Sequence, residues 1–313
     1  MSIAEPPAPL PGRPDTLGPG LRRILAPNPS PMTLHGTNTY LLGTTDLAVI
    51  DPGPDDPQHL AAILSAQQPG QRITHIFVTH AHLDHSPLAR RLSRESGAPV
   101  LGYGDARAGR SEIMQTLARG GLLGGGEGVD HEFVPDIALE DGAIIGAEGW
   151  QLRCLWTPGH FGNHLSFVSE ESVFSGDLVM GWASSLVSPP DGDLTDFMAS
   201  CRRLRAVSAK VLHAGHGAPI TAPKARIDWL ISHRLGREAM IRKALADGPA
   251  TAAGLTARIY TDTPASLRPA AERNVLAHLI DLCARRIARA DGPLQASAQF
   301  RLEPRMGGRE HFD

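Results

Sequence analysis

Apolar and polar positions alternate in short blocks over most of the chain. From Leu34 to Leu212, runs of apolar and β-branched residues predict strands, because each run ends at glycine, proline or a polar cluster. Helical spacing interrupts these strands at 55–67, 88–96 and 195–207. From Pro223 the pattern becomes mainly helical, most clearly at 226–246 and 271–290. The sequence therefore predicts a mixed α and β body followed by a smaller helical region.

Proline density and composition divide the chain into three predicted segments. Residues 1–30 are proline-rich and suit a lead-in that covers the surface without forming an element, 31–222 carry the strands, and 223–313 form the tail. Residues 104–128 contain a glycine-rich insertion, which is either a lid over a site or a plain surface loop. A chain of 313 residues, 42% of them hydrophobic, is long enough to bury a core in the larger segment.

Charge and cysteine content narrow the class of protein. The net charge of −3 is uneven, since the tail holds 15 Lys and Arg against 10 Asp and Glu, which fits either a nucleic-acid contact or a solvated helix surface. The three cysteines lie too far apart for a disulfide framework. No apolar export segment or membrane-length run is present in the sequence. We therefore expect a cytoplasmic protein that does not bind membranes.

The strongest chemical signal is the stretch from Ile73 to His85. An apolar run that reads as a buried strand is followed within a few positions by His80, His82, Asp84 and His85. The first two alternate and the last two are adjacent, which excludes a single helix face and predicts side chains that diverge from a loop at a strand end. Imidazole nitrogen and carboxylate oxygen suit zinc, iron or manganese, and two diverging pairs suit two ions better than one.

Later strands bring further metal-binding side chains to their ends. The predicted strand at 150–157 is followed by His160, and the one at 173–175 by Asp177. A third, at 211–212, leads into His213 and the glycine-flanked His216. Functional side chains commonly collect on loops at one rim of a sheet, so these positions predict one site built from several strand ends.

The order of these motifs along the chain resembles that of the metallo-β-lactamase fold superfamily. Its pattern is His-x-His-x-Asp-His followed by single ligands, and the resemblance covers about residues 32–220. It implies the α+β class, with a four-layer αββα sandwich and a dinuclear site at one edge of two packed sheets. It also implies that one ion is held by His80, His82 and His160, and the second by Asp84, His85 and His216. Asp177 would then bridge the two ions.

Two features of the sequence indicate a branch of that superfamily. Asp177 stands where antibiotic-hydrolysing members usually have cysteine, whereas glyoxalase II, thioesterase, lactonase and nuclease members use aspartate. The segments 36–40, 50–54 and 175–182 resemble the subfamily of β-lactamase-like protein two, which implies a small C-terminal winged-helix-like domain. The animal member of that subfamily is associated with endoribonuclease activity, and related fungal members are thioesterases that act on carrier-bound polyketides.

The resulting interpretation is a metal-dependent hydrolase with two divalent ions, Zn²⁺ before iron or manganese. A hydroxide shared by the ions would attack a small-molecule ester or thioester, while Asp177 balances charge on both ions and Asp84 orients the nucleophile. Two alternatives stay open: a single-strand endoribonuclease that holds RNA with its basic tail, and a non-catalytic winged-helix protein with a vestigial metal site. A homo-oligomer fits any of the three.

Four further residues are candidates for supporting or substrate-binding roles. Asp51, left at a strand end, either accepts a hydrogen bond from a ligating imidazole or forms a turn before Pro52. His164 either faces the substrate or packs in the interior. His35 and Asn38 precede a strand, where they either contact substrate or form a loop.

Overall fold

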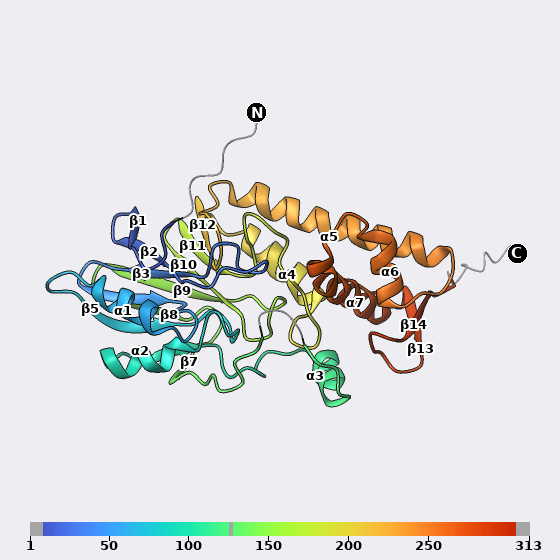
Figure 1. Ribbon diagram of the computed structural model, residues 1–313, viewed down its shortest axis with the longest axis horizontal. Helices are drawn as coiled ribbons and strands as arrows, with labels where there is room; N and C mark the ends of the chain where they lie inside the picture. Colours follow the sequence, from blue (N-terminus) through green and yellow to red (C-terminus); the bar gives the residue numbers. More distant parts are fainter. Residues whose placement is uncertain (1–8, 125–127, 305–313) are drawn as a thin grey trace, which may run out of the picture. The chain divides into compact units, whose positions relative to one another are not determined.

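The computed structural model describes residues 9–124 and 128–304 (Figure 1). The chain divides into two compact units between Ser232 and His233. Helix α5 (Pro223–Ala246) contributes residues to both units. None of the helices in the described part of the chain combines the length and the apolar character that a membrane span needs.

The first unit contains a seven-stranded and a five-stranded sheet. The larger sheet runs in chain order, antiparallel from the first to the fourth strand and parallel from there on. Its strands are β1 (Asp15–Gly18), β2 (Leu21–Leu25), β3 (Asn38–Leu42), β4 (Asp46–Ile50), β5 (Arg72–Phe77), β6 (Val100–Gly102) and β7 (Ile137–Ala138). The smaller sheet has the order β12-β11-β10-β9-β8. Its strands are β8 (Ile144–Ala147), β9 (Trp150–Trp156), β10 (Leu165–Ser169), β11 (Ser172–Gly176) and β12 (Val211–Ala214).

Buried apolar faces explain how these layers pack. One core cluster joins the two sheets and includes Phe77 of the first sheet and Phe167 and Phe174 of the second. Another lies between the larger sheet and its helices, with Ile63 and Leu92 among its members. The helices of this unit, before α5, are α1 (Pro57–Ser65), α2 (Leu88–Ser96), α3 (Glu112–Arg119) and α4 (Leu194–Arg205). The predicted α+β sandwich of two sheets flanked by helices is confirmed.

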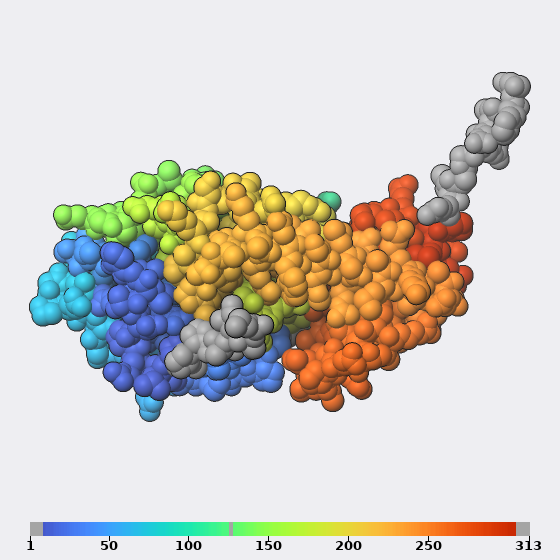
Figure 2. All heavy atoms as spheres, turned by 90° about the horizontal axis from the view of Figure 1, so that it is seen from above, coloured from blue at the N-terminus to red at the C-terminus, as the bar shows by residue number. Residues whose placement is uncertain are grey.

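The predicted N-terminal lead-in is wrong for residues 15–25. Strands β1 and β2 lie there and extend the larger sheet, and Figure 2 shows this region in dark blue on the outer surface of the first unit. Ile24 and Leu25 are buried because β2 places them against the core. The prolines that suggested an irregular segment flank the strands, with Pro14 before β1 and Pro19 in the turn that follows it.

The second unit combines helices with a β hairpin. Besides its part of α5 it contains α6 (Ala252–Ile259), the short η1 (Ala265–Leu267), α7 (Arg268–Ala284), and the pair β13 (Ala288–Asp291) and β14 (Gln299–Leu302). The helix predicted at 271–290 overruns its end, because Arg286 adopts a left-handed φ of 56° and the chain then enters β13. The first strand of the hairpin was missed because residues 288–290 were included in the predicted helix.

Candidate metal centre

Loops at the ends of strands carry all seven predicted ligands. His80 to His85 follow β5, and α2 begins only at Leu88, which confirms the predicted loop. His160 lies between β9 and β10, Asp177 follows β11, and His216 follows β12. All seven side chains are buried. The fold therefore gathers residues from distant parts of the sequence at one place on the rim of the sheets.

Three histidines form the first group. His80 Nε2 and His160 Nε2 lie 2.8 Å and 3.1 Å from His82 Nδ1. The opposite nitrogen of His160, Nδ1, lies 2.7 Å from the carbonyl oxygen of Leu186. A carbonyl only accepts hydrogen bonds, so Nδ1 of His160 carries the proton and Nε2 presents a lone pair. The three nitrogens together can hold a metal ion.

The second group mixes carboxylates with imidazoles and contains Asp84, His85, Asp177 and His216. His216 Nε2 lies 3.1 Å from Asp84 Oδ2 and 3.2 Å from Asp177 Oδ2. The same Oδ2 of Asp177 is 3.8 Å from His160 Nε2, in the first group. The Nδ1 of His216 donates to the carbonyl oxygen of Gly36 at 3.1 Å, so Nε2 is the nitrogen that faces the carboxylates and that would bind a metal ion in place of a proton. Asp177 therefore faces both groups.

The two groups differ in their electrostatics. Burial, reinforced by the neighbouring imidazole of His160, lowers the pKa of His82 to about 3. Burial also opposes the charged form of His216, but Asp177 and Asp84 outweigh it and raise the pKa of His216 to about 10. Burial alone would raise the pKa of Asp84, yet the imidazoles of His85 and His216 hold it below its usual value. The carboxylates thus hold positive charge in the second group, as they would hold a cation.

Buried carboxylate oxygens without hydrogen-bond partners support metal binding by these two groups. Among the described residues, Oδ1 of Asp84 and Oδ1 of Asp177 are buried and lack a hydrogen-bond partner. A buried carboxylate oxygen without a partner is costly, so its retention is expected only where a ligand satisfies it. A bound cation and its water would do so. Nitrogen and oxygen donors of this kind suit zinc, iron or manganese.

Asp51 connects two of the loops beneath the metal groups. Its Oδ2 lies 2.9 Å from His85 Nδ1, and its carboxylate accepts hydrogen bonds from the backbone N–H and the hydroxyl of Thr79 at 2.7 Å and 2.8 Å. Its φ of 51° is left-handed, a conformation that non-glycine residues adopt rarely and often at functional sites. The hydroxyl oxygen of Thr79 in turn lies 2.9 Å from His80 Nδ1. Asp51 therefore orients a histidine of the second group directly and one of the first group through Thr79.

The other three candidates occupy different positions. His164 is fully buried, its Nε2 accepts a hydrogen bond from the backbone N–H of Asp177 at 3.3 Å, and it therefore lies beneath that residue and not in an open pocket. Asn38 donates to the carbonyl oxygens of Ala214 and Gly217 at 3.0 Å and 2.9 Å, on either side of His216. His35 is exposed and contributes to the wall of a cavity.

Three residues near the site escaped the sequence analysis. Thr79 directly follows the predicted strand 73–78 and was not singled out. Asn163 was taken as part of a loop, although its side chain accepts from the backbone N–H of Ala81 at 3.2 Å. Gly215 was noticed only as a flank of His216. A Cβ there would lie 2.3 Å from Oδ1 of Asp177, so only glycine fits. Its position between two histidines at a strand end was the available signal.

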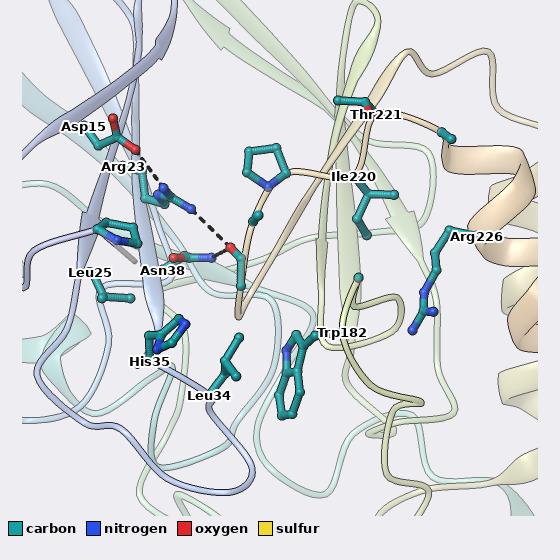
Figure 3. Close-up of a pocket in the computed structure, with 16 residues that line it drawn as sticks. Asp15, Arg23, Leu25, Leu34, His35, Asn38, Trp182, Ile220, Thr221 and Arg226 are labelled. Carbon is teal, nitrogen blue, oxygen red and sulfur yellow. Dashed lines mark hydrogen bonds and ion pairs between the residues drawn. The ribbon is translucent and has the colours of Figure 1, made fainter. Parts of the chain in front are cut away.

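A cavity of about 660 Å³ borders the loop that holds His216; we name it the Trp182 cavity (Figure 3). Its wall is largely apolar, with Leu25, Leu34, Trp182 and Ile220 among the lining residues. Figure 3 shows Arg23 between Asp15 and the carbonyl oxygen of Gly217, at 2.7 Å and 3.1 Å. The ion pair with Asp15 compensates the charge of Arg23, so the cavity suits an apolar group.

Comparisons with known proteins agree with this arrangement. Residues 32–216 match the Metallo-beta-lactamase superfamily, and 251–294 match the Beta-lactamase associated winged helix domain. The chain is 30% identical to a Beta-lactamase-like protein 2 homolog of Caenorhabditis elegans, over 86% of each chain. It is 31% identical to an Atrochrysone carboxyl ACP thioesterase of Aspergillus fumigatus, over 81% of this chain and 77% of that one. A metallo-beta-lactamase family protein of Thermus thermophilus has a similar structure, with a TM-score of 0.74 and 26% identity over 92% of this chain and 100% of that one.

Proposed function

The chain belongs to the metallo-beta-lactamase superfamily and is a metallo-hydrolase with a C-terminal winged helix domain, and we propose that it hydrolyses acyl thioesters with two divalent ions, preferably Zn²⁺. Two similar proteins are named as thioesterases, at 31% and 29% identity. The observation that carries the proposal is the position of Asp177, whose carboxylate faces histidines of both groups. A carboxylate shared in this way is suited to two ions.

In this proposal each group holds one ion. The first ion is held by His80, His82 and His160; the second by Asp84, His85 and His216; and Asp177 is shared. When bound, the ions supply a water of lowered pKa and positive charge opposite a developing oxyanion. Iron or manganese in place of zinc would preserve the geometry, because the donor types are the same.

The protein's own groups would position the reactants. Asp84 offers Oδ1, which has no hydrogen-bond partner among the described residues, as the acceptor that orients the attacking water. Asp51 and the carbonyl oxygen of Gly36 keep the Nδ1 protons of His85 and His216 in place, so that both Nε2 atoms remain available to the metal. The Trp182 cavity would receive the apolar acyl group.

The test is a substrate panel of acyl thioesters, esters, lactones and single-stranded RNA, with metal content measured for every protein. Wild type is compared with Asp177→Asn, and Asp55→Asn serves as the control because Asp55 is exposed and forms a surface ion pair with Arg91. We expect thioester hydrolysis by wild type and the control, and a loss of about 10³-fold in kcat for Asp177→Asn, corresponding to several kcal/mol of charge stabilisation.

Two results would contradict the proposal. Cleavage of RNA without any thioester turnover by the fully loaded protein would indicate an endoribonuclease. Near-zero metal content after loading, with no turnover of any substrate, would indicate a binding protein with a vestigial site.

A further inference from the structure

A second cavity, of about 870 Å³, is lined by segments that are hydrogen-bonded to two of the metal-binding loops; we name it the arginine pocket after Arg107, Arg110 and Arg119 in its wall. One side of this pocket is the segment 128–131. The backbone N–H of Leu83 donates to Gly128 at 3.1 Å, that of Asp130 donates to Ala81 at 2.9 Å, and Val129 forms an isolated β-bridge with His82. This wall is therefore fixed to the loop that carries His82.

The opposite wall is fixed to the loop that carries His160. It includes Pro190 and Asp191. The backbone N–H of Asp193 donates to the carbonyl oxygen of Gly159 at 2.9 Å, and the carbonyl of Leu186 in the same segment faces His160 Nδ1 at 2.7 Å. Both walls are thus hydrogen-bonded to metal-binding loops, while none of the metal-binding side chains lines the pocket itself.

The pocket carries positive charge that the protein compensates only in part. Arg110 is mostly buried and pairs with Asp191 at 2.5 Å, while its Nε lacks a hydrogen-bond partner among the described residues. Arg107 and Arg119 are exposed, and neither forms an ion pair within the described ranges 9–124 and 128–304. His131 also lines the pocket. Three guanidinium groups and one carboxylate leave an excess of donors for an anion.

On the premise that the protein hydrolyses thioesters, we propose that the arginine pocket binds a phosphate on the thiol arm of the substrate, as in a phosphopantetheine-type thioester. The forked guanidinium group matches the oxygens of a phosphate. Bond cleavage would take place at the metal groups, and a thiol arm that extends past the loops of His82 and His160 would reach this pocket. The Trp182 cavity, on the side of His216, is mostly apolar, and its arginine without a carboxylate partner among the described residues, Arg226, donates to the carbonyl oxygens of Met180 and Ala183.

A nucleic-acid strand is the competing source of phosphate. Proteins that hold single strands without sequence preference combine basic side chains with aromatic rings on which bases stack. The lining of the arginine pocket contains no phenylalanine, tyrosine or tryptophan among the described residues. A phosphate on a small arm therefore suits it better than a chain of nucleotides.

The experiment compares two thioesters with the same acyl group. Acyl-coenzyme A carries phosphates on its thiol arm, and acyl-N-acetylcysteamine has a short neutral arm. We measure the ratio of kcat/KM for the two substrates in wild type, in Arg107→Gln/Arg119→Gln, and in the charge-matched control Arg94→Gln/Arg202→Gln, whose arginines are exposed elsewhere. We expect the ratio to fall about fivefold for each pocket arginine removed, mainly through KM, and to stay at the wild-type value in the control. Added salt should lower the wild-type ratio in the same direction.

Different outcomes separate failure of the pocket from failure of the proposed function. Hydrolysis of both thioesters with a ratio unchanged by the pocket substitutions would overturn the pocket and leave the thioesterase intact. If neither thioester is hydrolysed, calorimetric binding of coenzyme A to wild type and to the pocket variant decides: weaker binding in the variant supports the phosphate site, and equal binding overturns it.

Two further measurements identify the source of the phosphate. An acylated carrier protein tests the carried form of the arm, and either a carrier or a coenzyme A preference that depends on Arg107 and Arg119 supports the proposal. Single-stranded RNA is added as a competitor. Inhibition by RNA that disappears in the pocket variant, without any effect of the substitutions on the thioester ratio, would assign the pocket to RNA and overturn the proposal.

Discussion

Buried histidines have opposite surroundings in the two units of the chain. In the first unit, His85 has its Nδ1 2.9 Å from Asp51 and its Nε2 within 3.5 Å of two further carboxylates. In the second unit, His278 is equally buried, but both ring nitrogens lack a hydrogen-bond partner among the described residues. Nearby charges also differ, because the groups that act on His278 are cationic, Arg234 and Arg285 among them.

This difference shows what makes a buried histidine a metal ligand. Burial lowers the pKa of His278 to about 3, with further lowering by the arginines, so the ring stays neutral and acts as a packing group. Burial opposes protonation of His85 too, yet Asp84, Asp177 and Asp51 raise its pKa well above the usual value. Carboxylates that attract a proton also attract a metal ion. A histidine surrounded by arginines does neither.

The largest expected effect comes from adding one methyl group at Gly215. In Gly215→Ala, the Cβ would lie 2.3 Å from Oδ1 of Asp177 and 2.6 Å from Cε1 of His85, so at least one of these side chains must move. Displacement of a catalytic group by about 1 Å lowers activity by about 100-fold, and we expect at least that loss in kcat together with lower metal content. Steady-state kinetics and elemental analysis provide the measurement.

The matched control for this prediction lies in the second unit. Gly236 is within α5, and a Cβ built there meets no atom within 4 Å. Gly236→Ala should leave activity unchanged and raise the free energy of unfolding by about 0.5–1 kcal/mol, because alanine has the higher helix propensity. Full metal content and activity in Gly215→Ala would show that the site is less tightly packed than the distances indicate.

The sequence predicted the parts of this centre that depend on short motifs. Loop placement of His80 and His85 followed from a strand that ended just before them, and the order of later strand ends indicated His160 and Asp177. His216 was preferred to His213 through its flanking glycines. The structure places His213 against the rings of Tyr40 and Phe174, away from both metal groups.

Long-range contacts were beyond such reasoning. Nothing in the sequence indicates that Asn163 reaches the backbone of Ala81, because their positions are joined only by folding. The burial of His164 could not be predicted either, because the position of a histidine in the sequence does not show whether its side chain lines a pocket or packs in the interior. Strand β2 was missed for another reason: the prolines around it suggested an irregular segment, although Ile24 and Leu25 are both apolar and buried.

The second prediction makes His85 resemble His278 by removing a carboxylate. In Asp51→Asn, the backbone N–H of Thr79 needs the amide oxygen at the Oδ1 position, so the NH2 group faces His85. Nδ1 of His85 must then accept, and its proton moves to Nε2, the atom proposed to bind metal. Loss of such a supporting partner lowers metal affinity by about 10–100-fold. Competition with a chromogenic chelator measures the affinity. Asparagine tolerates the left-handed φ of 51° at this position, so the fold is expected to persist.

The control for Asp51→Asn is Asp46→Asn, at the other end of the same strand. Asp46 forms a surface ion pair with Arg72 at 2.7 Å, so its loss should change stability by less than about 1 kcal/mol and leave metal affinity unaltered. Equal metal affinity in wild type and Asp51→Asn would mean that the amide has turned its oxygen towards His85 and that the carboxylate charge is dispensable.

The smallest effect concerns His278 itself and appears as a dependence of stability on pH. The unfolded histidine has a pKa of about 6.5, and burial lowers the folded pKa to about 3. Between these values the unfolded state binds more protons, so stability is fully present above about pH 6.5 and falls as the pH decreases towards 3. Each pH unit in this window should shift the unfolding equilibrium about tenfold, roughly 1.4 kcal/mol.

Denaturant unfolding of wild type and His278→Leu at roughly pH 7, 6 and 5 isolates this contribution, because other groups titrate alike in both proteins. The variant should lose less stability on acidification, and parallel losses would show that His278 binds protons alike in the folded and unfolded states.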